Sequence, residues 1–324
     1  MASFRSRKNK WQARIIRKGH PTIAKTFLTK QDAEKWARSV EIEIDRGTFI
    51  NTSYAQKTLF KEILQKYLND VAIHMRSADN QAIRIRKFME HPIAEVNMAH
   101  LSPKHMADYR DERLKVIKPN TVIRELAVLS SIINHARREW GLNIINPITM
   151  IKKPSSTKGR DRILNDEELG QLLIQLEKIS PWYKPLVEFA LETAMRRGEL
   201  MALLWANVNF DKSVAFLPLT KNGDSRYVPL SSKAIRILKA LPRDIEGRVF
   251  PLNKGTVSIL FLRATRRAKI EDVHFHDLRH MAITRLASMF SNPLELAVIS
   301  GHKSLGMLKR YTHLKAEDLV KKLG

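Results

Sequence analysis

The stretch His276-Asp277-Leu278-Arg279-His280 decides how the rest of the chain is interpreted. A histidine and an arginine three residues apart on a helix share a face, so His276 and Arg279 can act on one anionic group from the same side. The arginine fork suits phosphate oxygens, and histidine is the side chain best placed to move a proton near neutral pH. Downstream, Gly301-His302 and Tyr311 add a further imidazole and a candidate covalent nucleophile. The pattern therefore favours chemistry on an anionic substrate.

Further motifs stand at intervals along the second half of the chain. Together with His276 to His280 they are Glu192-Thr193-Ala194-Met195-Arg196-Arg197-Gly198-Glu199-Leu200, Thr220-Lys221-Asn222-Gly223-Asp224-Ser225-Arg226, Ser300-Gly301-His302 and Arg310-Tyr311-Thr312-His313. In order and spacing these boxes resemble the tyrosine recombinase (phage integrase) family, especially temperate-phage integrases and shufflon-type DNA invertases. Ala194 departs from the glycine that the family usually has there, at a position where the backbone matters more than the side chain.

The resemblance implies a phosphodiester site built from several cations. Such a site must neutralise a pentacoordinate transition state and protonate the leaving oxygen. The implied clamp on the non-bridging oxygens is formed by Arg196 and Arg279. Lys221, beside a hairpin tip, is implied as the general acid at the leaving 5′ oxygen. His276 is implied as proton acceptor and phosphate ligand, and His302 as a further phosphate donor.

Tyr311 is the implied nucleophile, because it follows His302 by the family's usual interval. A phenol has an ordinary pKa of about 10, so it needs a cationic site or a base to react at neutral pH. Attack would leave a 3′-phosphotyrosyl link and a free 5′ hydroxyl. The link keeps the bond energy, so rejoining needs no ATP or metal. We accordingly expect no cofactor, and the sequence has no Walker-type loop or acidic cluster suited to Mg²⁺.

Each of these residues also has a plainer interpretation. Glu199 can form a structural ion pair with either arginine of the clamp, and a turn lysine such as Lys221 is usually only solvated. Most tyrosines are half-buried packing residues. His280 and His313 are expected to pack or to support the site, since the family's role falls on the first histidine of the box. Arg197 is set aside because the catalytic arginine of the family directly follows the triplet ending at residue 195.

The charge balance predicts a polyanionic partner. Lys and Arg number 57 against 33 Asp and Glu, a formal net charge of +24, which favours nucleic acid over a merely solvated basic surface. No cysteine is present, so disulfides and thiolate metal sites are excluded. No apolar run reaches the roughly 20 residues of a membrane span, and the basic N-terminus lacks the apolar core of a signal peptide. We expect a soluble cytoplasmic protein acting on the nucleoid.

Residues 1–50 are predicted to form a small basic domain. Trp11 to Ile15 alternates like a strand, Ala24 to Phe27 favours a second strand, and Thr29 caps a helix. This unit resembles the arm-type DNA-binding domain of integrases. Trp11 and Trp36 are expected to pack in its core rather than stack on bases. Its candidate phosphate contacts are Lys8, Lys10, Arg14 and Arg17.

Two further domains follow. After a predicted linker at 51–57, residues 57–150 are expected to form a helical core-binding domain, in which Asn120 opens a long helix and Arg124 is either a DNA contact or a solvated side chain. A second linker is predicted over 151–162. Residues 160–324 then form a mixed α/β catalytic domain with a hairpin around Asn222-Gly223. The expected fold class is mainly α with small β-sheets (α+β).

The leading functional expectation is a site-specific DNA recombinase that integrates, excises or inverts DNA. Its expected partners are double-stranded DNA with specific recombination sites, further copies of itself as a tetramer on synapsed DNA, and host DNA-bending and directionality proteins. Two alternatives stay open. A type IB topoisomerase shares the active site but relaxes supercoils without exchanging partners, and an accessory DNA-binding factor would carry a dead site.

Overall fold

The chain divides into two compact units, residues 1–158 and 159–324. The boundary falls inside the linker predicted over 151–162. The computed structural model describes residues 2–7, 9–18, 22–46, 53–75, 77–157, 160, 162–218, 225–290, 292–309 and 311. Helices dominate both units and each contains one small three-stranded sheet, so the predicted α+β fold class is confirmed.

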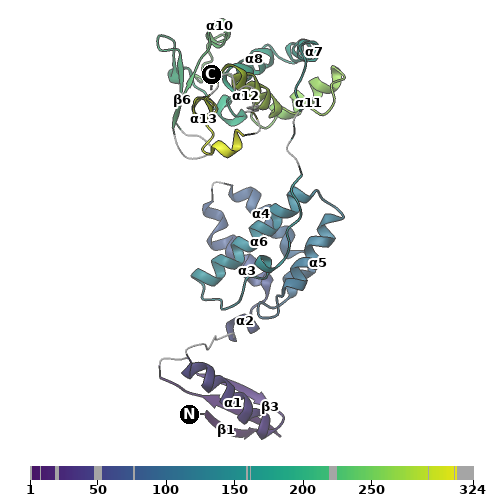
Figure 1. The fold of residues 1–324 in the computed structure, drawn as a ribbon, viewed down its shortest axis with the longest axis vertical. Helices are drawn as coiled ribbons and strands as arrows, with labels where there is room; N and C mark the ends of the chain where they lie inside the picture. Colours follow the sequence, from purple (N-terminus) through teal and green to yellow (C-terminus); the bar gives the residue numbers. More distant parts are fainter. Residues whose placement is uncertain are drawn as a thin grey trace, which may run out of the picture. The chain divides into compact units, whose positions relative to one another are not determined.

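The first unit begins with a sheet covered by one helix (Figure 1). Antiparallel strands β1 (Ala2–Arg7), β2 (Lys10–Ile15) and β3 (Ile23–Phe27) lie in that order, and α1 (Lys30–Asp45) packs on one face. The Thr29 hydroxyl accepts a hydrogen bond from the Asp32 backbone N–H, as the predicted cap requires. The strands at β2 and β3 and the helix are confirmed, whereas β1 was not predicted. A separate apolar core holds this part together, made of Ala13, Ile15, Ala33, Ala37, Val40 and Ile44.

The face of this sheet turned away from α1 carries exposed cations. Strand residues alternate between faces, and Ala13 and Ile15 point into the core. Arg14, between them, therefore points outward. Its neighbour across the sheet is Ser3 on β1, and Arg5, two residues after Ser3, lies on the same outer face. The tryptophans pack as expected: Trp36 lies 5.5 Å from Phe27 between ring centroids, and both Trp11 and Trp36 border the core.

Not every predicted phosphate contact of this sheet is equally available. Arg17 forms an ion pair with Asp45 at 2.8 Å, while Lys10 is exposed on β2. Lys8 lies outside the described residues. Arg124 is exposed on the long helix of the next part.

The rest of the first unit is a helical body with its own core. Its elements are α2 (Ser53–Lys57), α3 (Phe60–Asp70), η1 (Ala72–His74), α4 (Ala78–Met89), η2 (Pro92–Glu95), α5 (Pro103–Leu114), α6 (Pro119–Glu139) and η3 (Pro147–Met150). The predicted stripe of the long helix is buried: Val122, Leu126, Leu129, Ile133 and Ala136. The helix starts one residue earlier than expected, at Pro119, because Pro is favoured in the first helical turn.

The linker predicted over 51–57 is wrong for residues 53–57, which form α2. Ala55 is 1% exposed and packs in the core of the helical body. The Asn97 amide donates to the Gln56 carbonyl at 2.8 Å, so α2 is fastened by residues about forty positions away. Such tertiary contacts leave no local pattern in the sequence.

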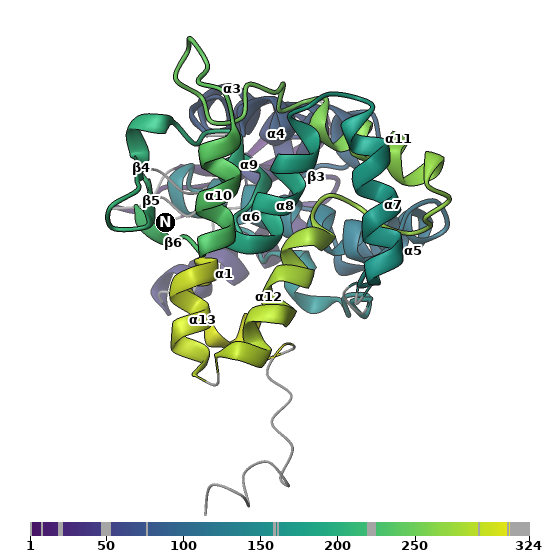
Figure 2. The same cartoon turned by 90° about the horizontal axis from the view of Figure 1, so that it is seen from above.

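The second unit is built around α8 (Tyr183–Thr193), which packs against α7 (Asp166–Glu177), α10 (Ser232–Ala240) and α12 (Asp277–Met289) (Figure 2). Its other elements are α9 (Arg197–Leu200), η4 (Trp205–Asn207), β4 (Val208–Asn209), β5 (Val214–Leu217), β6 (Arg226–Pro229), α11 (Val257–Arg267), α13 (Pro293–Ser300) and η5 (Leu305–Met307). Asn165 and Glu168 form the predicted capping box of α7. The hairpin is confirmed by the antiparallel pairing of Phe216 with Tyr227, although its tip lies outside the described residues.

The end of the predicted linker is attached to the second unit. The Arg160 guanidinium lies 2.8 Å from an Asp272 carboxylate oxygen and 3.2 Å from one of Asp277. The Asp277 side chain is 3% exposed and stands at the first position of α12, where it also accepts from the His274 backbone N–H at 2.8 Å. Arg160 therefore anchors the start of the helix that carries Arg279. Among the described helices, none combines the length and apolarity needed to cross a membrane.

Candidate active site

Arg196 enters the site through a sharp turn between two helices. Helix α8 ends at Ala194, which has left-handed backbone angles (φ 51°, ψ 21°), and Arg196 caps α9 in an extended conformation. The Arg196 guanidinium donates to Glu199 at 2.8 Å and to the Gly301 carbonyl at 2.8 Å. Glu199 also accepts from the Arg196 backbone N–H at 2.9 Å. Both the backbone and the guanidinium group of Arg196 are therefore held in place by hydrogen bonds.

Arg279 reaches the same place from the first turn of α12. It is 4% exposed, and its guanidinium donates to the carbonyls of Ala194 and Ser300, each at 2.6 Å. Burial, and then the nearby charge of Arg196, lowers the pKa of Arg279 to about 9. The side chain stays charged at neutral pH. The two predicted clamp arginines are thus brought together from elements about eighty residues apart.

His276, His280 and Tyr311 form a row beside these arginines. His276 stands just before α12 and is exposed, and its ring meets His280 edge-on with centroids 5.1 Å apart. The Nδ1 atom of His280 is hydrogen-bonded to the Tyr311 hydroxyl. The two rings are nearly parallel, with centroids 5.9 Å apart and planes 24° apart. His280, predicted only to pack or support, therefore touches the oxygen predicted to be the nucleophile.

His302 lies directly after the C-terminal end of α13 and contacts Arg279. Its Nε2 is 3.4 Å from the Arg279 guanidinium, and its Nδ1 is 2.6 Å from the Ser300 hydroxyl. That hydroxyl donates its only hydrogen to the Leu296 carbonyl, so Nδ1 must be the donor of the second bond. Burial, and then the charges of Arg279 and Arg196, lowers the pKa of His302 to about 4. In the neutral ring Nε2 is consequently an acceptor that faces a guanidinium.

Arg226 and Glu199 complete the cluster, and the sequence did not single out Arg226. Glu199 has a side chain 4% exposed and pairs with Arg196 and with Arg226, the latter at 2.9 Å. Burial disfavours the carboxylate, yet both arginines outweigh it and lower the pKa of Glu199 below its ordinary value. Arg226 also donates to the Ile299 carbonyl at 2.6 Å, and its Nε is buried with no hydrogen-bond partner among the described residues.

The end of α13 organises all three guanidinium groups. The carbonyls of Ile299, Ser300 and Gly301 are consecutive, and each accepts from a different arginine. In the same order, the donors are Arg226, Arg279 and Arg196. A helix C-terminus presents unpaired carbonyls and the negative end of the helix dipole, which offsets repulsion between neighbouring cations. The helix end thus holds a cluster of positive charge ready for an anion.

Several predicted residues are not brought into this arrangement. Lys221 and His313 lie outside the described residues, so their positions relative to the cluster stay predictions. Arg197, set aside from the sequence, has its guanidinium hydrogen-bonded to the Ser258 hydroxyl instead of to the cluster.

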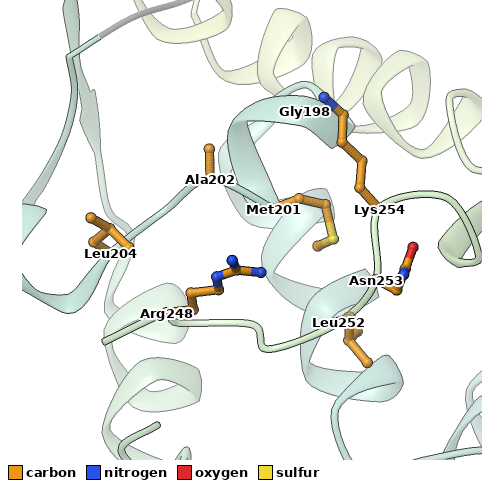
Figure 3. Close-up of a pocket in the computed structure, with 8 residues that line it drawn as sticks. All are labelled: Gly198, Met201, Ala202, Leu204, Arg248, Leu252, Asn253 and Lys254. Atoms are coloured by element: carbon orange, nitrogen blue, oxygen red, sulfur yellow. The ribbon is translucent and has the colours of Figure 1, made fainter. Parts of the chain in front are cut away.

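A separate hollow of about 470 Å³ opens beside α9. Figure 3 shows Met201 and Gly198 on one side of it and the side chains of Arg248 and Lys254 extending from loops. Its lining, as far as the described residues extend, contains neither the three clustered arginines nor the histidine row. The candidate site is therefore the open cationic cluster rather than this hollow.

Known proteins resemble this chain in sequence and in fold. Residues 162–318 match the model of the phage integrase family. A shufflon-specific DNA recombinase of Escherichia coli is 42% identical over 277 residues, covering 83% of this chain and 72% of that protein. The tyrosine recombinase XerC of Xanthomonas campestris pv. campestris is 24% identical, covering 71% of this chain and 73% of its own. A lambda integrase dimer bound to a COC' core site has a similar fold, with a TM-score of 0.68 at 20% identity over 95% of this chain and 94% of that one.

Proposed function

Because the chain belongs to the phage integrase family of tyrosine-type site-specific DNA recombinases, we propose that Tyr311 is the residue that cuts the DNA strand. Its Oη attacks the scissile phosphorus and forms a 3′-phosphotyrosyl bond as the bond from phosphorus to the 5′ oxygen breaks. Rejoining runs in reverse, with a 5′ hydroxyl attacking the same phosphorus. The observation that carries this proposal is the hydrogen bond from the Tyr311 hydroxyl to His280, one residue after Arg279 on α12.

Arg196 and Arg279 are the proposed clamp on the non-bridging phosphate oxygens. Both guanidinium groups are held by backbone carbonyls at the end of α13, so neither has to be reoriented when the phosphate arrives. Preorganised donors of this kind stabilise charge that develops in the transition state, each worth about 3–4 kcal/mol. Arg226 adds positive electrostatic potential to the site, and its ion pair with Glu199 offsets the negative charge of that carboxylate.

The remaining roles are assigned to Lys221 and two histidines. Lys221 supplies the proton to the leaving 5′ oxygen, and exposed His276 binds a phosphate oxygen. His302 faces Arg279 with an acceptor atom in its neutral form, so it orients that guanidinium. For His302 to donate to phosphate it must take up a proton, which the negative charge of the phosphate favours.

The DNA partner is proposed to contact both units. In the first unit, the outward face of the β1-β2-β3 sheet offers Arg5, Lys10 and Arg14 to backbone phosphates of a flanking, arm-type site. The helical body, residues 57–150, is proposed to bind the core site. Synapsis of two sites requires several copies of the chain, and we propose a tetramer, acting at the nucleoid with host bending and directionality proteins.

A nicked suicide substrate tests the nucleophile. Cleavage next to the nick releases a short 5′-hydroxyl fragment, which traps the enzyme on the DNA. The wild-type chain should give a covalent adduct on a denaturing gel, and Tyr311→Phe should give none while binding the same DNA nearly as well. An adduct in the Tyr311→Phe protein would reassign the nucleophile.

The same substrate separates recombination from the two alternative activities. Absence of covalent trapping in the wild-type chain would favour an accessory DNA-binding factor. Trapping without transfer of the held strand to a second duplex would favour a relaxing enzyme. We expect both trapping and transfer.

Lys221 is tested by a chemical bypass. A substrate with sulfur in place of the bridging 5′ oxygen needs no proton at the leaving atom, because a thiolate is a good leaving group. Lys221→Ala should be defective on the normal substrate and restored on the sulfur-containing one. A Lys221→Ala protein defective on both substrates would remove the general-acid role.

A further inference from the structure

His280 is in contact with the oxygen that is proposed to react. The Nδ1 atom of His280 and the Tyr311 hydroxyl are hydrogen-bonded, and the two rings lie with planes 24° apart. His276, four residues earlier on the same helix face, meets the ring of His280 and is exposed to solvent. The two imidazoles are therefore placed for different tasks.

A phenol attacking phosphorus has to lose its proton. With an ordinary pKa of about 10, only about one tyrosine in a thousand is ionised at pH 7. An imidazole has an ordinary pKa of about 6.5, which makes it an efficient proton acceptor under the same conditions. General-base catalysis requires the acceptor within hydrogen-bonding reach of the proton that it removes. The nitrogen in that position here is Nδ1 of His280.

We propose that His280 is the general base that accepts the Tyr311 proton during strand cleavage. The neutral His280 ring carries its hydrogen on Nε2 and uses the Nδ1 lone pair to take the proton from Tyr311 Oη. The electron pair of the O–H bond then forms the bond from Oη to phosphorus, and the pair of the breaking bond leaves with the 5′ oxygen. In rejoining, the His280 imidazolium returns its proton to Oη as Tyr311 leaves. This inference rests on the proposed function of Tyr311.

The two histidines of the box thus have different roles. His276 is exposed to solvent, which suits a ligand for an incoming phosphate. His280 is partly buried between His276 and Tyr311, which suits an acceptor dedicated to one hydroxyl. The next residue toward the N-terminus, Arg279, binds the same phosphate in the proposed mechanism, so α12 supplies clamp and base from adjacent positions.

The test compares His280→Asn with His276→Asn in the full chain. Asparagine keeps a hydrogen-bond acceptor near the position of Nδ1 but is not a base. His280→Asn should lower the single-turnover cleavage rate of the nicked substrate about 10²–10⁴-fold at pH 7. Its rate should then rise about tenfold per pH unit, because the fraction of ionised phenol rises in that way below a pKa of about 10. His276→Asn should lower the rate without acquiring this slope.

Replacing Tyr311 with a difluorotyrosine gives an independent readout. Fluorine lowers the pKa of the phenol, so less help is needed to remove its proton. The substitution should restore cleavage to the His280→Asn protein at least tenfold more than to the His276→Asn protein. Binding of the intact site and the thermal unfolding midpoint verify that both variants are folded.

Two results would overturn the base assignment. One is a His280→Asn protein that cleaves at the wild-type rate. The other is a defect that neither alkaline pH nor fluorination relieves, which would mean that His280 only packs against Tyr311. A covalent adduct formed by Tyr311→Phe would instead refute the proposed nucleophile, so the two failures are distinguishable. If His280→Asn does not fold, the pH profile of the otherwise wild-type fluorinated protein decides, since its cleavage should lose dependence on the base.

Discussion

Positive charge is arranged in two different ways in the two units of this chain. Arg279 in the second unit is 4% exposed and held by two carbonyls, whereas Arg14 in the first unit stands on an exposed sheet face. A buried and oriented cation is costly to place but can stabilise a transition state at a fixed point. An exposed cation costs little and contributes mainly salt-dependent affinity. The buried arginines therefore suit catalysis, and the exposed ones suit DNA binding.

Removing a buried arginine of the clamp is expected to have the largest effect. Arg196→Ala and Arg279→Ala should each slow cleavage about 10²–10³-fold, in line with the loss of one preorganised donor. Single-turnover cleavage of the nicked substrate measures this. Arg197→Ala is the matched control, because that side chain bonds Ser258 outside the cluster. Equal losses in Arg196→Ala and Arg197→Ala would mean that position within the cluster does not matter.

Gly301→Ala should show that the buried cluster is tightly packed. Gly301 has φ +68°, and an added Cβ would lie 2.7 Å from Nε of Arg226. Left-handed strain of about 1–2 kcal/mol adds to the cost of displacing this guanidinium, so unfolding free energy should fall by about 2–4 kcal/mol. Gly247→Ala carries a similar φ of +73° with nothing within 4 Å, and so isolates the backbone cost. Equal destabilisation in urea unfolding by both would contradict close packing at Gly301.

The cationic cluster should also make the protein sensitive to acid through His302. Its pKa is about 4 in the folded chain against an ordinary 6.5, so the unfolded chain binds the proton first as pH falls. The neutral His302 ring therefore contributes stability that is fully present above pH 6.5 and is lost as the pH falls to 4. About 2 kcal/mol of it is lost by pH 5. Urea unfolding of wild-type and His302→Asn proteins at pH 7.5 and pH 5 measures this. His302→Asn should lose less stability on acidification, and equal losses would place the acid sensitivity elsewhere.

The exposed sheet should give the smallest and most salt-dependent effect. Arg5→Gln with Arg14→Gln should reduce the slope of log affinity against log salt by about 1.8, at about 0.9 per phosphate contact. Cleavage of a minimal core site should not change. Lys35→Gln with Arg38→Gln, on the exposed side of α1, is the control of equal charge. If both pairs change the slope equally, the sheet face has no special role in binding DNA.

The family and much of the fold could be predicted because they depend on short sequence motifs. The five boxes predicted the family, which is confirmed, and cap residues such as Thr29 and Asn165 predicted where helices begin. Ala194, which replaces the family's usual glycine, does adopt the left-handed conformation that glycine favours. Its methyl group is fully buried, so a small residue fits there.

The features that escaped prediction depend on contacts between distant residues. Arg226 joins the cluster only because β6 lies beside α13, and a hairpin arginine has no local pattern that reveals this. Helix α2 forms because Ala55 is buried by the helical body. His280 meets the Tyr311 hydroxyl only when two segments about thirty residues apart come together, and no local pattern reveals that contact. The six catalytic assignments themselves stay predictions until the variants are measured.

The capture of three arginines by three consecutive carbonyls has a consequence for control. Because Ile299, Ser300 and Gly301 belong to one rigid helix end, displacing that end would disturb all three guanidinium contacts together. The three contacts are therefore expected to be lost together rather than one at a time. A regulator of strand cutting would not have to displace each arginine separately, because one movement of the end of α13 would reach all three.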